Sequence, residues 1–160
     1  MRSHPEAFQA ILLTPFARLG IRTGDERIEE IVFLPSEGSA LAPRNRLAER
    51  ACRQIERYIG DPRYRFDLPV RARGTAFQHR VWREISAIAA GHTRSYGEIA
   101  RELGSAPRAV GQACGANPLP LVVPCHRVLA AGGIGGFAHH RYGFPLSVKR
   151  WLLAHEGVAP

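Results

Sequence analysis

The sequence predicts an α/β protein of the α+β type, built from a small N-terminal domain with an antiparallel sheet plus a helix and a mostly helical C-terminal domain. Residues 6–34 carry short apolar runs separated by turn formers, as an antiparallel meander requires. Residues 44–59 carry apolar side chains every four positions, which is typical of a helix with one buried face. In the C-terminal domain, capping residues begin several short helices. We expect these helices to include a helix-turn-helix and to accompany an active-site strand.

The N-terminal domain is expected to span residues 1–70. Its three apolar runs are Ala7–Leu12, Ala17–Ile21 and Ile28–Leu34. The helix follows over residues 44–59, and Gly60-Asp61-Pro62 ends it. Residues 63–74 contain a proline and alternating charges, so we interpret them as a linker or a single extended strand and place the domain boundary there.

The C-terminal domain is expected to span residues 71–160 and to open with a helix that Thr75 caps. Apolar side chains three and four residues apart form one stripe along it, namely Phe77, Val81, Ile85 and Ile88. We expect Gly91 to end this helix.

Two further short helices match the helix-turn-helix pattern. Ser95 caps the first over residues 96–103, with Glu98 as its capping-box partner, and Gly104 ends it. The second begins near Pro107 and is built mainly from alanine and glycine. Such small residues suit close approach to a minor groove better than base reading in the major groove. A tight contact between two protein helices explains them equally well.

Positive charge is concentrated in the C-terminal domain. The whole chain has a formal net charge of +8, with 22 basic and 14 acidic residues. Residues 71–160 carry eleven of the basic residues but only four of the acidic ones. This asymmetry favours a polyanion such as nucleic acid as the partner, whereas a generally cationic surface is the alternative interpretation.

Several classes of protein are disfavoured by the sequence. Three cysteines are too few for a disulfide framework and lack the spacing of a metal finger. No apolar stretch approaches the roughly 18 residues of a membrane span, and the N-terminus lacks the apolar core of a signal peptide. We therefore expect a cytoplasmic protein without a membrane partner. The sequence carries no signal for self-association, so we expect a monomer.

One segment is a candidate for chemistry: Pro124-Cys125-His126-Arg127-Val128, which follows a short apolar run at residues 119–123. We interpret that run as a buried strand with Cys125 at its end. A cysteine in apolar surroundings is inert, but beside a histidine it can become a thiolate nucleophile. Taken alone, a buried cysteine is more often a packing residue.

Six motifs between about residues 74 and 157 occur together in one order. They are Phe77-Gln78 with Val81-Trp82, the run from Thr93 to Ala100, Arg108–Gly111, Asn117-Pro118, Pro124–Val128, and Lys149–Gly157. With these motifs the chain resembles the O6-alkylguanine-DNA alkyltransferases, also called methylated-DNA–protein-cysteine methyltransferases. The N-terminal half matches that family only in general character.

The resemblance implies a set of catalytic roles. Cys125 would accept the alkyl group irreversibly, in a single turnover and without a cofactor. His126 would remove the thiol proton through a water molecule, and Glu156 would orient His126. Asn117 would support the turn and polarise the cysteine side of the pocket. Tyr96 would press on the DNA phosphate and supply a proton to the leaving guanine.

The resemblance also implies the partner, double-stranded DNA containing O6-alkylguanine, whose damaged base is flipped out through the minor groove. Arg108 would insert into the base stack, and the other DNA contacts would come from Tyr96, Ala109, Gly111, Gln112, Ser95 and Arg127. The base pocket would be lined by Val128, Gly136, Phe137 and Tyr142. Extra residues at 139–142 leave open which aromatic residue, Phe137 or Tyr142, walls it. The adjacent His139 and His140 lack a third ligand, so no metal site is expected.

Three alternative functions remain at this stage. A non-catalytic protein of the same fold would bind alkylated DNA, but such relatives lack the acceptor cysteine that this chain keeps. A helix-turn-helix transcription regulator would need polar base-reading side chains along its second helix, which this sequence does not supply. A Cys-His hydrolase would need an oxyanion hole and would turn over many times. The sequence does not choose between methyl and larger groups, or between guanine and O4-alkylthymine lesions.

Overall fold

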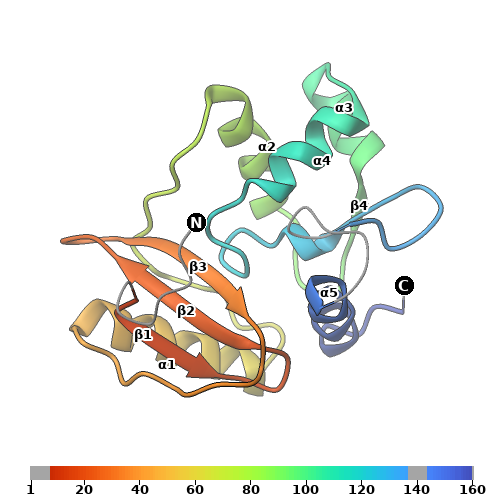
Figure 1. Ribbon diagram of the computed structural model, residues 1–160. Helices are drawn as coiled ribbons and strands as arrows, with labels where there is room; N and C mark the ends of the chain where they lie inside the picture. The colour runs from red at the N-terminus through yellow and green to blue at the C-terminus, as the bar shows by residue number, and fades with distance from the viewer. Residues whose placement is uncertain (1–7, 137–143, 160) are drawn as a thin grey trace. The chain divides into compact units, whose positions relative to one another are not determined.

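The computed structural model describes residues 8–136 and 144–159 (Figure 1). The chain divides into two compact units, Met1–Arg73 and Gly74–Pro160. The first unit contains an antiparallel sheet and a helix, and the second is mainly helical. The α+β fold class predicted from the sequence is therefore confirmed.

The sheet of the first unit is a meander with the strand order β1-β2-β3. Its strands are β1 (Ala10–Leu13), β2 (Arg18–Thr23) and β3 (Ile28–Leu34), one for each predicted apolar run. Thr14 makes the turn between β1 and β2, because its hydroxyl and its N–H both donate to the Ala17 carbonyl. Both strand pairs are antiparallel, and the register between β2 and β3 shifts at Arg22 and Thr23.

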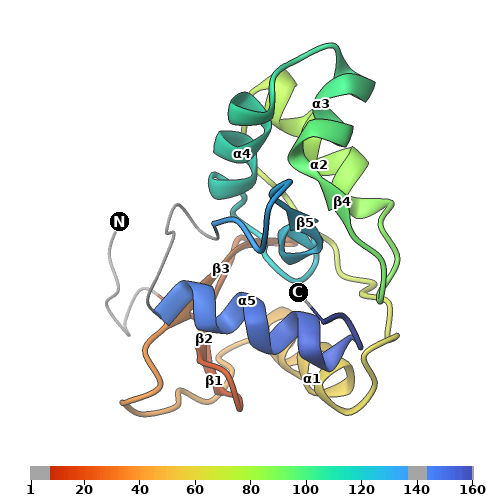
Figure 2. The same cartoon turned by 90° about the vertical axis from the view of Figure 1, so that its right-hand side faces the viewer.

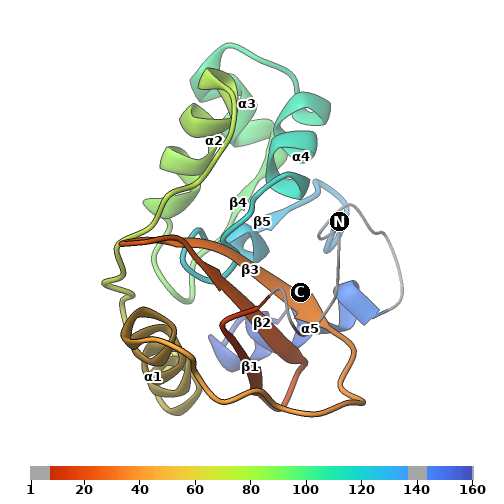
Figure 3. The ribbon, with the colours of Figure 1, turned by 60° about the vertical axis from the view of Figure 1, so that its left-hand side comes forward.

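Helix α1 (Arg46–Gly60) covers one face of this sheet (Figure 3). Asn45 caps its first turn, since its side-chain oxygen accepts the N–H of Ala48 at 2.8 Å. The buried face of α1 consists of Ala48, Ala51, Cys52, Gln54, Ile55 and Tyr58. Apolar burial between helix and sheet gives this unit its core.

The segment after α1 is tied to its own unit by hydrogen bonds. The side chain of Gln54 donates to the Asp67 carbonyl at 3.0 Å and accepts the Asp67 N–H at 2.8 Å. Further along, Ile28 of β3 donates to the Pro69 carbonyl and accepts the Arg71 N–H. The expected linker is thus an extended segment that forms a parallel bridge with the first residue of β3.

Three helices of the second unit pack together: α2 (Ala76–Ser86), α3 (Tyr96–Leu103) and α4 (Pro107–Gly115) (Figure 2). Thr75 and Ser95 cap α2 and α3 as predicted, and each forms a capping box, the predicted one of Ser95 with Glu98 and a further one of Thr75 with Gln78. Gly104 ends α3 with a φ of +66°, a conformation that glycine adopts without steric cost. The indole N–H of Trp82 fixes α2 to α4 by donating to the Ala113 carbonyl at 2.9 Å.

Helix α2 is shorter than the sequence predicted. It ends at Ser86 rather than continuing through Ile88 to Gly91. Ala87 and Ile88 form tight turns, with their N–H groups donating to carbonyls three residues earlier. Ile88 nevertheless remains buried. Its place in the apolar stripe therefore reflects burial in a turn and not a longer helix.

The expected active-site strand at residues 119–123 is wrong. This segment, all of it within the described residues, forms a turn in which the Val123 N–H donates to the Leu119 carbonyl at 2.9 Å. Leu121 has a φ of +76°, which is unfavourable for a branched side chain and incompatible with a strand. A strand comes only later: β5 (Val128–Leu129) pairs in parallel with β4 (Arg94–Ser95).

Helix α5 (Phe144–His155) closes the second unit. Its apolar side chains Leu146, Val148, Leu152 and Leu153 are all buried. Among the residues that the structure describes, no helix combines the length and apolarity needed to cross a membrane.

Candidate active site

Cys125 is the first residue of η2 (Cys125–Arg127), a short 3-10 helix that begins after Pro124. Its N–H donates to the Val123 carbonyl at 2.8 Å. The side-chain amide of Asn117 donates to the same carbonyl at 2.9 Å and to Cys125 Sγ at 3.2 Å. Asn117 Oδ1 in turn accepts the Leu119 N–H at 2.9 Å. One side chain just beyond α4 therefore holds both the turn and the sulfur atom.

The Cys125 thiol is buried, with 4% of the residue exposed, and burial raises its pKa well above the ordinary value. Hydrogen bonding with Cys114 and the charge of that thiol also raise the pKa, whereas the Asn117 amide and the Lys149 ammonium lower it. The resting group is consequently a neutral thiol. It becomes a nucleophile when a nearby base removes its proton.

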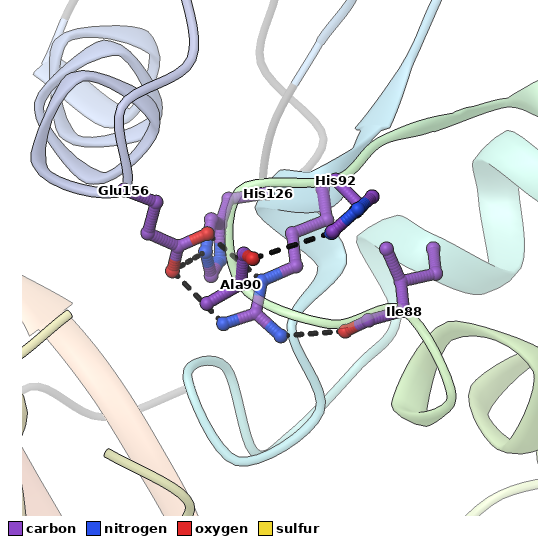
Figure 4. A network of polar contacts seen from close by, with 6 residues as sticks. Ile88, Ala90, His92, His126 and Glu156 are labelled. Carbon is purple, nitrogen blue, oxygen red and sulfur yellow. Dashed lines mark hydrogen bonds and ion pairs between the residues drawn. The ribbon is translucent and has the colours of Figure 1, made fainter. Parts of the chain in front are cut away.

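His126 and Glu156 supply such a base (Figure 4). The imidazole Nε2 lies 2.8 Å from Glu156 Oε2, and both side chains are buried. Burial lowers the pKa of His126, although Glu156 acts in the opposite direction, so the imidazole is neutral near pH 7. With Nε2–H donating to the carboxylate, Nδ1 is the nitrogen that can accept a proton.

Arg127 lies inside the protein beside Glu156, which corrects its expected place on the DNA-binding surface. Its Nε and Nη2 donate to the two carboxylate oxygens of Glu156, each at 2.9 Å. Its Nη1 donates to the Ile88 carbonyl at 2.6 Å, in the loop drawn in Figure 4. Only 12% of the Arg127 side chain is exposed. Arg127 thus holds the carboxylate that orients His126, in the bidentate geometry that guanidinium favours.

Tyr96 and Lys149 converge on one backbone carbonyl near Cys125. The Tyr96 hydroxyl donates to the Gly136 carbonyl at 3.3 Å, and Lys149 Nζ donates to the same oxygen at 2.9 Å. Lys149 also donates to the Val128 carbonyl at 2.8 Å. Burial raises the pKa of Tyr96, and the Cys114 and Cys125 charges raise it further, so the phenol keeps its proton.

Sequence reasoning missed Lys149, which is fully buried. Burial lowers the pKa of Lys149 to about 8, although the charges of Cys114 and Cys125 act to raise it. A signal for its position was available in the helical spacing. Leu152 and Leu153 lie three and four residues after Lys149, Glu156 lies four and three residues after them, and all four are buried, so they share one face. A lysine in such an apolar stripe indicates that the fold provides hydrogen-bond acceptors for its ammonium group.

The second unit also matches known proteins. Residues 76–158 match the family model described as 6-O-methylguanine DNA methyltransferase, DNA binding domain. A methylated-DNA–protein-cysteine methyltransferase of Methanosarcina acetivorans is 34% identical over 158 residues, which cover 94% of this chain and 98% of that protein. The chain belongs to the methylated-DNA–protein-cysteine methyltransferase family. The resemblance predicted from the six motifs is therefore confirmed.

Solved structures of this methyltransferase family resemble the chain over nearly its whole length. The O6-methylguanine methyltransferase of Mycobacterium tuberculosis matches with a TM-score of 0.74 and 33% identity, covering 94% of this chain and 93% of that one. The M. tuberculosis OGT crystallised in complex with DNA matches with a TM-score of 0.73 and 33% identity. That match covers 91% of this chain and 90% of the other. The fold of the family thus extends over both units of the chain.

The helix-turn-helix of this methyltransferase-family chain places several predicted DNA-contact residues at the surface. Arg108 and Gln112 are exposed on α4. Ala109 and Gly111 are partly buried on the same helix. Ser95 is engaged locally, because its hydroxyl accepts the Glu98 N–H as the N-cap of α3. Arg108 thus presents a cationic side chain at the exposed start of α4.

The predicted base pocket is described only in part. Val128 is buried, and Gly136 offers the carbonyl that Tyr96 and Lys149 share. Phe137 and Tyr142 lie outside the described residues, as do His139 and His140, so the choice of aromatic wall stays a prediction. Within residues 8–136 and 144–159, no three histidine, cysteine, aspartate or glutamate side chains are arranged to hold a metal ion.

Proposed function

We propose that this chain repairs DNA by transferring the alkyl group of O6-alkylguanine in duplex DNA to Sγ of its own Cys125. The observation that carries the proposal is the arrangement around the sulfur. A buried thiol is held by Asn117, and the next residue in the chain is His126, whose imidazole is neutral and oriented by Glu156. Family membership supports the substrate class, since relatives are named for methylated DNA.

The transfer needs a nucleophile, a base and a proton for the leaving group. Nδ1 of His126 takes the thiol proton through a water molecule while Glu156 stabilises the imidazolium that forms. The Cys125 thiolate then attacks the alkyl carbon in line, forming a carbon–sulfur bond as the bond to guanine O6 breaks. Tyr96, held as a neutral phenol, supplies a proton to the departing guanine. The thioether is stable, so each molecule reacts once and needs no cofactor.

Duplex DNA has to deliver the damaged base to this buried thiol. Base flipping costs a few kcal/mol, and Arg108 inserted into the vacated stack offsets most of that cost. The remaining contacts to the minor groove are assigned to Tyr96, Ser95, Ala109, Gly111 and Gln112. One copy contains the acceptor, its base and the inserting residue, so the proposed reaction needs only a monomer, and the proposal places it in the cytoplasm.

Intact-mass measurement with excess lesion DNA tests this function. After incubation with a duplex containing O6-methylguanine, the protein should gain the mass of one methylene group, located on the peptide that contains Cys125. The number of titratable thiols in the denatured protein should fall from three to two. The matched control is the same duplex with unmodified guanine, which should change neither value. Three titratable thiols after incubation with excess lesion would contradict the proposal.

Arg108→Ala is expected to slow transfer from duplex DNA by about 10²-fold, if the finger offsets most of a flipping cost of about 3 kcal/mol. Transfer from the free base O6-methylguanine should be almost unaffected, because that substrate needs no flipping. Single-turnover rates on the two substrates measure the difference. Arg101→Ala removes the same charge from an exposed position on α3 and is the control. Equal slowing of both substrates by Arg108→Ala would rule out the finger role.

A further inference from the structure

A buried cluster of charges surrounds His126, and one member of that cluster, Arg127, takes no step in the proposed transfer. Oε2 of Glu156 lies 2.8 Å from His126 Nε2 (Figure 4) and accepts a hydrogen bond from Arg127 Nη2 at 2.9 Å. Arg127 Nε donates to the other carboxylate oxygen, also at 2.9 Å. The side chains of His126 and Glu156 are 2% and 0% exposed. The imidazole and the guanidinium therefore share one carboxylate away from solvent.

The protonation state of His126 decides the net charge of this cluster. With a neutral imidazole, the Arg127 guanidinium and the Glu156 carboxylate compensate each other. An added proton on His126 would leave one positive charge uncompensated inside the protein, which is costly. If Arg127 were absent, the neutral imidazole would instead leave the carboxylate without a cation. Protonation of His126 would then be favoured, because it would form a buried imidazolium–carboxylate pair.

We propose that Arg127 offsets the attraction of Glu156 for a proton on His126 and so keeps the imidazole neutral, which lets it serve as a base. A base that already carries its proton cannot take another from a thiol. Arg127 is a positioning residue in this scheme, because it acts through Glu156 and His126 and not on the alkyl group. The use of His126 as the base rests on the proposed function, whereas the charge state of His126 does not.

The electrostatic surroundings of His126 agree with this role. Burial is the largest cause of its lowered pKa. Among the charged groups around it, Glu156 raises the pKa, whereas Arg127 and the buried ammonium group of Lys149 lower it. The two cations thus act together with burial, and the carboxylate acts against all three.

The turn that follows α2 fixes both members of the ion pair. Arg127 Nη1 donates to the Ile88 carbonyl in this turn at 2.6 Å. Gly91 in the same turn lies close to the end of α5, since a Cβ atom added there would be 3.3 Å from the backbone oxygen of Glu156. The guanidinium is therefore held against the carboxylate by a third partner and cannot leave without breaking that contact.

Titration of His126 by NMR in the full-length protein tests this proposal, with its ring signals assigned by their absence in His126→Gln. In Arg127→Met the pKa of His126 should rise by about one unit or more, because the guanidinium charge is lost while Glu156 stays. Arg127→Lys keeps a positive charge, so its His126 should titrate closer to that of the unmodified protein. If Arg127→Met does not fold, Arg127→Gln replaces it, because its neutral amide can still donate a hydrogen bond to Glu156.

The matched control removes a different arginine of the same unit. Helix α2 also packs against η2, and its Glu84 is paired with Arg94 at 3.0 Å, while its other titratable side chains, at positions 79, 80 and 83, are exposed. Arg94→Met breaks that partly exposed pair and should leave the pKa of His126 unchanged.

Single-turnover transfer rates give the kinetic counterpart of the titration. The acid limb of the rate profile of Arg127→Met should move to higher pH, by the amount that NMR finds for His126. Duplex and free-base substrates should show the same movement, since both need the same base. A merely structural role would lower the rate at every pH and leave the limb in place.

An unchanged or lower pKa of His126 in the folded Arg127→Met or Arg127→Gln variant would overturn the proposal. So would a shift of equal size in Arg94→Met, because the effect would then not be specific to the cluster. Absence of alkyl transfer by the unmodified protein would instead refute the proposed function. The titration would still decide whether Arg127 keeps His126 neutral.

Discussion

Cys125→Ser is expected to abolish alkyl transfer while the protein remains folded and still binds duplex DNA. Serine differs from cysteine by one atom, and its oxygen can accept the Asn117 amide hydrogen that Sγ now accepts. The hydroxyl, however, holds its proton much more tightly than a thiol does, and His126 is too weak a base to remove it. Incubation with duplex O6-methylguanine should leave all lesions in place and the protein mass unchanged, over times in which the unmodified chain reacts completely.

Cys52→Ser is the matched control, since it removes a buried thiol from the other unit. It should retain the full extent of transfer, so that a loss at position 125 reflects chemistry rather than a missing cysteine. Methyl transfer to Cys125→Ser at the extent of the unmodified protein would move the acceptor elsewhere. Cys114 would then be the first position to examine, because Asn117 hydrogen-bonds to both Cys114 and residue 125.

The elements that the sequence predicted well are those in which local interactions and burial agree. The caps at Thr75 and Ser95 and the helix end at Gly104 need only residues within one helical turn. Strands β1 to β3 follow from apolar runs joined by short turns. Local chemistry thus sufficed for most of the fold and for the place of the helix-turn-helix in the chain.

The sequence failed where hydrogen bonds of particular side chains, rather than apolar periodicity, determine the structure. The apolar run at residues 119–123 predicts a strand. Asn117 instead holds it as a turn through hydrogen bonds with Leu119 and Val123, and Leu121 has a positive φ. The family resemblance implied a DNA contact for Arg127, yet Arg127 pairs with a carboxylate 29 positions away. Such contacts depend on how the elements pack, and the spacing of residues along the chain does not predict them.

Glu156→Gln is expected to lower both stability and transfer, because one carboxylate serves two buried partners. Arg127 would lose both of its charged acceptors, and breaking such a buried pair from one side costs about 3–5 kcal/mol in the free energy of unfolding. His126 would lose the carboxylate that raises its pKa, which burial already holds below the ordinary value. A weaker base removes the thiol proton less readily, so the rate of transfer should fall by about 10²-fold.

The sign of the pH effect follows from the same contacts. Transfer needs neutral His126, so the rate falls as pH drops through the pKa of that imidazole, which lies below its ordinary value. Removing the Glu156 charge lowers the pKa further, and the acid limb of the rate profile should move to lower pH. Single-turnover rates across pH measure this shift, and urea denaturation measures the stability. An unchanged acid limb would exclude Glu156 as the group that tunes His126.

Two further variants separate structure from catalysis. Glu84→Gln breaks the pair with Arg94, whose side chains are 30% and 31% exposed, and should cost about 1 kcal/mol or less without altering the acid limb. Adding Arg127→Met to Glu156→Gln removes the unpaired guanidinium and should recover much of the lost stability, because both charges are then absent. The double variant should still transfer slowly, since His126 still lacks its carboxylate. Recovery of the rate together with stability would mean that Glu156 only supports the fold and does not act through His126.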